Sequence, residues 1–278
     1  MKKFLAVLAA LTIILTMSSC SAVVDGLRNG VHKIIDNVDP EKITGRIVSL
    51  SGEVTEKTVY PADGKEITSV VLDGLSFSFK DDGEAYIKII PSDKNCVVLK
   101  YQSDLDDYGF YAAAEDGEIR LSAEKATQFR TSDFEAVVYA NCDSIRITGG
   151  IELFVEGCAK DSLTLDITGG VDAEMTGIDI DTLDITVIGA ADFDISGTAN
   201  KLSAVFNGAG ELDAKEFICK EAFVTVNGAG NAEISCTEKL EANINGAGGL
   251  EYYGSPSVNV GGASAKTVTQ KSPSVYGK

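Results

Sequence analysis

The sequence of 278 residues contains no tryptophan and a single histidine, His32. It has no Gly-x-Ser-x-Gly element and no Cys–His arrangement. These absences argue against catalysis by a nucleophile and a base. The lack of tryptophan also argues against carbohydrate recognition by stacking on aromatic rings.

Basic residues are scarce. The chain has 24 Lys and Arg against 42 Asp and Glu, a net charge of −18. This balance argues against a nucleic-acid partner, because phosphates need a basic surface. No arginine occurs between Thr148 and Ala263, which argues against the chemistry of β-helical polysaccharide lyases. We therefore predict that the protein is not an enzyme and needs no cofactor.

The cysteines form no recognisable motif. Five follow Cys20, an odd number, and no Cys-x-x-Cys pair exists. This pattern is neither a disulfide framework nor a zinc site. We expect single buried or half-buried thiols, although export would permit one bridge.

The sequence has only one long apolar run, at its beginning. Lys2 and Lys3 precede the run from Phe4 to Met17, which is too short to span a membrane comfortably. It ends at Met17-Ser18-Ser19-Cys20, which resembles a bacterial lipobox. The resemblance implies that residues 1–19 are a lipoprotein signal peptide and that Cys20 carries the lipid. An ordinary secretory signal cleaved nearby is the alternative.

The expected consequence is export. Loss of residues 1–19 would leave 22 basic and 42 acidic residues, a net charge of −20. So acidic a chain would be held on a bacterial membrane by its lipid alone, facing the periplasm or the cell exterior.

The next two segments differ in pattern. Residues 20–45 read as a lipid-anchored tether, either a short amphipathic helix or a flexible spacer. Residues 46–143 read as irregular β coils or a cap, with short strands separated by turn signals. The first strand is expected over 47–54, and another is expected to begin at Tyr108.

Residues 144–278 contain a repeat, followed by a C-terminal cap. Six glycine turns recur at intervals of 20, 20, 19, 20 and 18 residues; they begin at Thr148, Thr168, Ile188, Asn207, Asn227 and Asn245. A fixed period of this length marks a solenoid. We predict an all-β fold, a parallel β-helix with about 20 residues per coil, which favours binding over catalysis.

Strict alternation within each period sets the expected inward and outward faces. Inward positions are Leu163, Leu165 and Ile167 on a first strand and Val171, Ala173 and Met175 on a second, with counterparts in later periods. A second turn places Gly157, Gly177, Gly197 and Gly254 in one column.

Acidic residues recur at outward positions of the second strand. They form two columns: Glu152, Asp172, Asp192 and Glu211, and beside them Glu174, Asp194, Asp213, Glu233 and Glu251. In a parallel coil, neighbours in each column lie roughly 5 Å apart. Three interpretations stay open: a hydrated acidic face, weak oxygen-ligand sites for Ca²⁺, or a docking surface for a basic partner. Asn207, Asn227 and Asn245 form a further column, expected to be a structural asparagine ladder.

The sequence resembles the head-GIN-domain family in three features. These are the glycine turns, the run L-E-A-N-I-N-G-A-G-G-L-E-Y-Y-G-S-P from Leu240 to Pro256, and the run E-A-V-V-Y-A from Glu135 to Ala140. The resemblance covers about residues 70–265. It implies a bacterial secreted or surface lipoprotein with a β-helical fold and an adhesin role, and it brings no established binding residues.

We therefore expect a cell-envelope lipoprotein that acts as a surface binding or adhesion module. Its expected partners are the membrane, through the N-terminal lipid, and an extracellular or envelope ligand, either protein or glycan. The alternatives are a carbohydrate-active β-helix enzyme and a structural envelope component.

Overall fold

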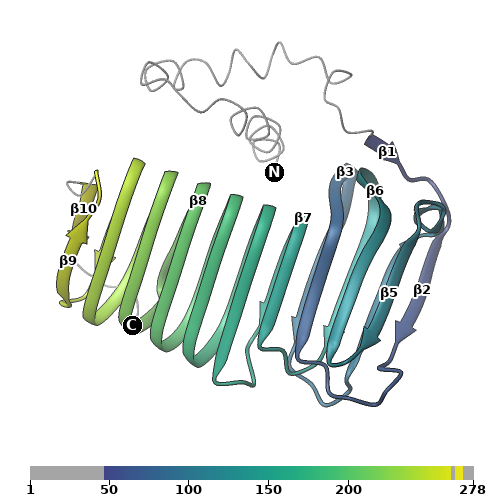
Figure 1. Ribbon diagram of the computed structural model, residues 1–278, viewed down its shortest axis with the longest axis horizontal. Helices are drawn as coiled ribbons and strands as arrows, with labels where there is room; N and C mark the ends of the chain where they lie inside the picture. The colour runs from purple at the N-terminus through teal and green to yellow at the C-terminus, as the bar shows by residue number, and fades with distance from the viewer. Residues whose placement is uncertain (1–46, 264–266, 272–278) are drawn as a thin grey trace, which may run out of the picture.

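The computed structural model describes residues 47–263 and 267–271, which are nearly all β (Figure 1). In chain order the elements are β1 (Ile47–Ser49), β2 (Val54–Val59), β3 (Ser69–Ile90), β4 (Cys96–Gln102), the 3₁₀ helix η2 (Ser103–Tyr108), β5 (Phe110–Glu115), β6 (Glu118–Tyr139), β7 (Ser144–Glu156), β8 (Ser162–Tyr253), β9 (Ser257–Gly261) and β10 (Val268–Lys271). The expectation of an all-β chain is confirmed. Within the described residues, no helix is long and apolar enough to cross a membrane.

All strands belong to one sheet that curls around a single core. The pairing order is β10-β8-β7-β3-β6-β4-β2, with β1 and β5 beside β6 and β9 beside β8. The long β8 passes repeatedly around the core in Figure 1, and we call each passage a winding. β7 pairs in parallel with the start of β8, from Ser144 opposite Thr164 to Glu156 opposite Thr176, an offset of 20 residues.

Three stretches of one winding, residues 163–167, 171–175 and 178–181, carry buried apolar side chains at alternate positions. We call these stretches and their counterparts in the other windings the first, second and third sides. The inward positions predicted for the first two sides are buried, namely Leu163, Leu165, Ile167, Val171, Ala173 and Met175. On the third side Ile178 and Ile180 are also buried. The predicted register of the strands is therefore confirmed.

The repeated glycine turn is the corner where the backbones of successive windings touch. Gly208 has φ +153°, and a Cβ there would lie 1.9 Å from the carbonyl oxygen of Gly189 in the preceding winding. No side chain fits at that distance, so the corner requires glycine. The asparagine beside this corner also stacks: Asn227 Nδ2 donates to Asn207 Oδ1 at 2.9 Å, and Asn245 Nδ2 donates to Asn227 Oδ1 at 3.0 Å. The expected asparagine ladder is present.

One step of the second glycine column is wrong, because Gly197 lies against the backbone of Ile178 rather than Gly177. The cause is winding length, because a winding of 19 residues shifts the register at this corner by one position. Gly254 lies against Cys236, the residue expected to replace glycine in that column.

The N-terminal half adds strands to the same sheet in a different order. β3 lies between β7 and β6, parallel to both, although β6 precedes β7 in the chain. β4 and β5 then pair antiparallel with β6. These strands therefore extend the sheet away from β8, at the end opposite β9 and β10 (Figure 1).

Two sequence-based boundaries are wrong in this half. The strand expected over 47–54 is divided into β1 and β2, because Ser51 N bonds to Asp104 Oδ2 at 2.7 Å and Gly52 packs against the backbone of Asp104. Tyr108 ends η2 instead of beginning a strand.

Candidate functional site: an acidic face and a groove

The second side of the windings carries the acidic columns. β-Sheet register places Glu152 opposite Asp172 and Phe154 opposite Glu174. Further along, Glu211 N donates to Asp192 Oδ1 at 3.0 Å. We call this surface the acidic face; its members are Glu152, Asp172, Glu174, Asp192, Asp194, Glu211, Asp213, Glu233 and Glu251. The side-by-side arrangement follows from the parallel register, because equivalent positions of neighbouring strands lie about 4.8 Å apart.

Counter-charges are unevenly distributed along the acidic face. At its C-terminal end, Lys215 Nζ lies 2.8 Å from Asp213 Oδ2 and 3.4 Å from Glu233 Oε2, and Lys271 lies 2.9 Å from Glu251. Tyr253 also donates to Glu233 at 3.2 Å. Among the described residues, no ion pair involves the earlier acids, namely Asp172, Glu174, Asp192 and Asp194.

The crowding affects titration at the N-terminal end of this face. Burial, and then the charge of Asp172, raise the pKa of Glu152 above its ordinary value. Burial, and then the charges of Asp192 and Glu174, raise the pKa of Asp172. Both shifts oppose ionisation, so a proton or a cation would relieve the repulsion there.

The acidic face is a row rather than a cage. Within residues 47–263 and 267–271, no group of three or more His, Cys, Asp or Glu side chains is arranged to hold a metal ion. The Ca²⁺ interpretation therefore stays a prediction. Cys20, the expected lipid attachment site, and the tether lie outside the described residues.

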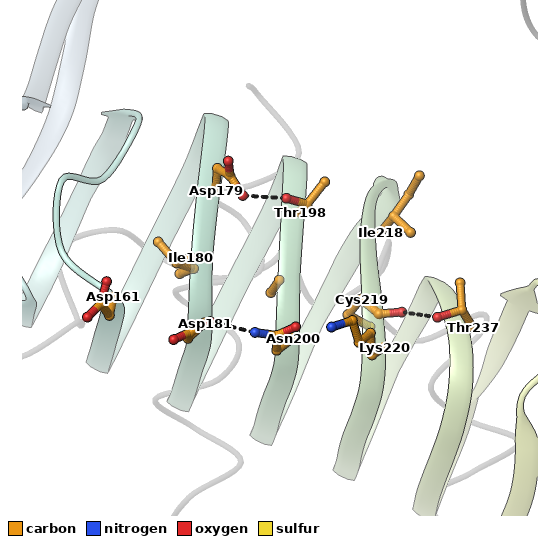
Figure 2. A pocket seen from close by; sticks show the side chains of 11 residues that line it. Asp161, Asp179, Ile180, Asp181, Thr198, Asn200, Ile218, Cys219, Lys220 and Thr237 are labelled. Atoms are coloured by element: carbon orange, nitrogen blue, oxygen red, sulfur yellow. Dashed lines mark hydrogen bonds between the residues drawn. The ribbon is translucent and has the colours of Figure 1, made fainter.

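The third side carries a groove that the sequence did not reveal (Figure 2). Its volume is about 480 Å³, and it crosses several windings. Figure 2 shows Asp179, Thr198 and Ile218 in one row and Asp161, Asp181, Asn200 and Lys220 in a second. Ala199, Cys219 and Thr237 complete its lining together with Ile180.

Hydrogen bonds between windings hold the groove's carboxylates. Thr198 Oγ1 donates to Asp179 Oδ1 at 2.6 Å, and Asn200 Nδ2 donates to Asp181 Oδ1 at 2.5 Å. Ile218 is 52% exposed, a large apolar side chain in a polar surrounding. The groove therefore combines oriented carboxylates, one lysine and one apolar contact, which suits binding of a cationic or hydroxylated ligand.

Sequence reasoning missed this groove for a physical reason. The third side is short, and its windings differ in length, so its rows do not align when the glycine turns are superposed. The signal available was the apolar Ile218 at an outward position that threonine or aspartate occupies in the preceding windings.

The family model described as "Putative auto-transporter adhesin, head GIN domain" matches residues 81–256, more than half of the chain. The chain belongs to this family. The resemblance noted in the sequence is thus confirmed, and it is consistent with a protein of the cell surface or envelope. Among curated proteins, none matches the sequence.

Several solved structures share the fold. A putative adhesin from Bacteroides fragilis is 18% identical, with a TM-score of 0.65 over 81% of this chain and 99% of that chain. A putative lipid binding protein from Parabacteroides distasonis is 13% identical, with a TM-score of 0.55 over 81% and 100% of the two chains. A putative adhesin from Parabacteroides merdae is 16% identical, with a TM-score of 0.54 over 81% and 99%. At these identities the similarity concerns the fold alone.

Proposed function

We propose that this protein is a cell-envelope lipoprotein that acts as a non-catalytic binding module of the adhesion type, and that the third-side groove is its contact surface. The observation that carries the proposal is the groove itself: it is open, crosses several windings and presents carboxylates already oriented by Thr198 and Asn200. Pre-oriented groups lower the entropy lost on binding.

A positively charged protein segment is the ligand that the groove's chemistry favours. Asp161, Asp179 and Asp181 would attract lysine or arginine, and Ile218 would pack against an apolar residue between them. The net charge of −18 would speed the encounter at low salt. A glycan is the second candidate, because carboxylate and amide groups also bind hydroxyls.

The proposed architecture supports this role. We infer a parallel β-helix from the 20-residue offset between β7 and β8, the glycine corners and the asparagine ladder. Such a stack holds its surface side chains on a rigid backbone. If the chain is anchored by a lipid on Cys20, the stack would hold the groove away from the membrane surface.

Binding can be tested with a labelled peptide that carries three lysines and one leucine, followed by fluorescence anisotropy. We expect the double variant Asp179→Asn/Asp181→Asn to bind about tenfold more weakly than the wild type, consistent with loss of charge-assisted contacts. The control Asp192→Asn/Asp194→Asn removes the same charge from the acidic face and should bind nearly as the wild type does.

Equal losses in the two double variants would mean that only the overall charge attracts the peptide, and the groove would not be the site. Groove-dependent binding of a neutral oligosaccharide, with no binding of the peptide, would favour a glycan ligand instead.

The anchor needs a separate test. The Cys20→Ser variant should move from the membrane fraction to the soluble or secreted fraction when expressed in a bacterium with lipoprotein processing. Mass spectrometry of the N-terminal peptide should find an acyl chain on Cys20 in the wild type. An unmodified Cys20 would contradict the lipoprotein assignment.

A further inference from the structure

Two buried cysteines meet at the C-terminal end of the groove. Cys219 and Cys236 lie on neighbouring windings, and each side chain is about 1% exposed. Cys219 Sγ lies 3.3 Å from the carbonyl oxygen of Ser235, the residue before Cys236, and the Cys219 thiol can donate a hydrogen bond to Cys236. The two thiols are therefore close to each other across the boundary between windings.

The backbone around the pair is tied together as well. Thr237 Oγ1 donates to the carbonyl oxygen of Cys219 at 3.3 Å, and Cys236 Sγ contacts the carbonyl oxygens of Lys220 and Lys239 at 3.1 and 3.0 Å. Ser235 and Lys220 are the chain neighbours of Cys236 and Cys219, so each thiol reaches across to the backbone beside the other cysteine.

We propose that Cys219 and Cys236 form a disulfide bond that joins two successive windings at the C-terminal end of the groove. The proposal goes beyond the binding function and does not depend on it. It requires an oxidising compartment, which the proposed export would supply.

Burial determines when the bond forms. Both cysteines are about 1% exposed, so a small disulfide does not reach either thiol in the folded chain. Oxidation therefore takes place while the chain folds. The Cys236 thiolate attacks a small disulfide such as oxidised glutathione and releases one glutathione thiolate. The Cys219 thiolate then attacks the mixed disulfide and releases the second. Two protein thiols lose two protons and two electrons, which reduce one glutathione disulfide to two thiols.

The other cysteines provide internal controls. Cys158 Sγ lies 3.6 Å from the carbonyl oxygen of Cys142, and Cys96 lies in the N-terminal half. We expect Cys96, Cys142 and Cys158 to stay reduced, so the bond would be selective for Cys219 and Cys236.

The test is refolding of the reduced, denatured full chain in a glutathione redox buffer, followed by alkylation, digestion with trypsin and mass spectrometry. We expect peptide 216–220 linked to peptide 221–239, with Cys96, Cys142 and Cys158 alkylated. Cleavage after Lys220 adds one water to the linked species, which distinguishes it from an uncleaved peptide. The Cys219→Ser variant should lack the linked species, and Cys96→Ser should retain it.

A second measurement removes dependence on peptide recovery. The oxidised wild type should unfold at a temperature about 5–10 °C above the reduced wild type, because the bond closes a loop of 17 residues. Cys236→Ser should show no difference between oxidised and reduced samples. Full alkylation of both cysteines after oxidative refolding, or a bond between any other pair, would overturn the proposal.

Discussion

Asn227 bonds to Asn207 across one winding, with Nδ2 2.9 Å from Oδ1, and the same amide accepts from Asn245 at 3.0 Å. Asn227, in the middle of the ladder, therefore makes one bond in each direction along the stack. These side chains are exposed, so each bond is worth on the order of 1 kcal/mol.

This arrangement predicts the effect of Asn227→Ala. The change removes both bonds and should lower the free energy of unfolding by about 1–2 kcal/mol in urea titrations. The exposed Asn231, which does not belong to the ladder, is the control: Asn231→Ala should change stability by less than about 0.5 kcal/mol. Similar losses in both variants would show that the ladder adds nothing beyond an ordinary surface asparagine.

The glycine corner predicts a larger effect. Gly208→Ala would place a methyl group 1.9 Å from the carbonyl oxygen of Gly189, and the windings would have to separate. We expect a loss above about 4 kcal/mol, or failure to fold, as for other severe backbone clashes. Gly177→Ala is the matched control, because Gly177 has φ +65° with nothing within 4 Å of the new methyl group. It should cost only about 1–2 kcal/mol, the cost of a left-handed backbone. Circular dichroism during thermal unfolding measures both.

The acidic face predicts an effect of divalent cations. If Ca²⁺ binds there, millimolar CaCl₂ should raise the unfolding temperature more than NaCl of equal ionic strength, because the ion binds only the folded array. We expect this additional effect of calcium to disappear when four carboxylates are replaced by their amides, at Asp172, Glu174, Asp192 and Asp194. The same replacements should raise the stability in the absence of calcium. Equal effects of the two salts would leave a hydrated acidic face as the interpretation.

Lysines at the other end of this face provide a control. Glu233 and Glu251 already lie beside Lys215 and Lys271. Glu233→Gln/Glu251→Gln should therefore bring no gain in stability without calcium, in contrast to the four changes above.

The raised pKa values of Glu152 and Asp172 predict a dependence on pH. A carboxyl group whose pKa is higher in the folded state than in the unfolded state destabilises the folded protein when it is ionised. Its contribution therefore lowers the free energy of unfolding as the pH rises from the unfolded pKa of about 4 through the raised folded pKa. At pH 7, Glu152→Gln/Asp172→Asn should raise the free energy of unfolding by less than about 1 kcal/mol, because both groups are partly exposed. At pH 3 the gain should vanish. A gain that persists at pH 3 would come from packing rather than charge.

The sequence predicted those features that repeat with the period of the windings. The alternation around Leu165 and Val171 identified the buried positions, because a strand with one face on the core must alternate. The asparagine and acidic columns followed from the same register. The order of β3, β6 and β7 was beyond prediction, because pairing between strands distant in the chain is not encoded in local periodicity.

The groove and the cysteine pair were missed for a related reason. Both lie on the third side, where windings of 19 and 18 residues depart from the period of 20. Cys219 and Cys236 are 17 residues apart in the sequence, and a strict alignment of periods does not place them together. Features that depend on differences in winding length can be recognised only when the three-dimensional path of the chain is known.

The position of β3 between β6 and β7 has a consequence for how proteins of this kind change in length. β3 has a parallel neighbour on each edge, so losing either neighbour exposes the edge of an interior strand. The later windings meet only the winding before and the winding after. When one whole winding is inserted into β8 or deleted from it, every remaining winding still lies next to another winding. The only other change is that β9 and β10 move along the stack. Such changes would lengthen or shorten the stack of windings while leaving the N-terminal half intact.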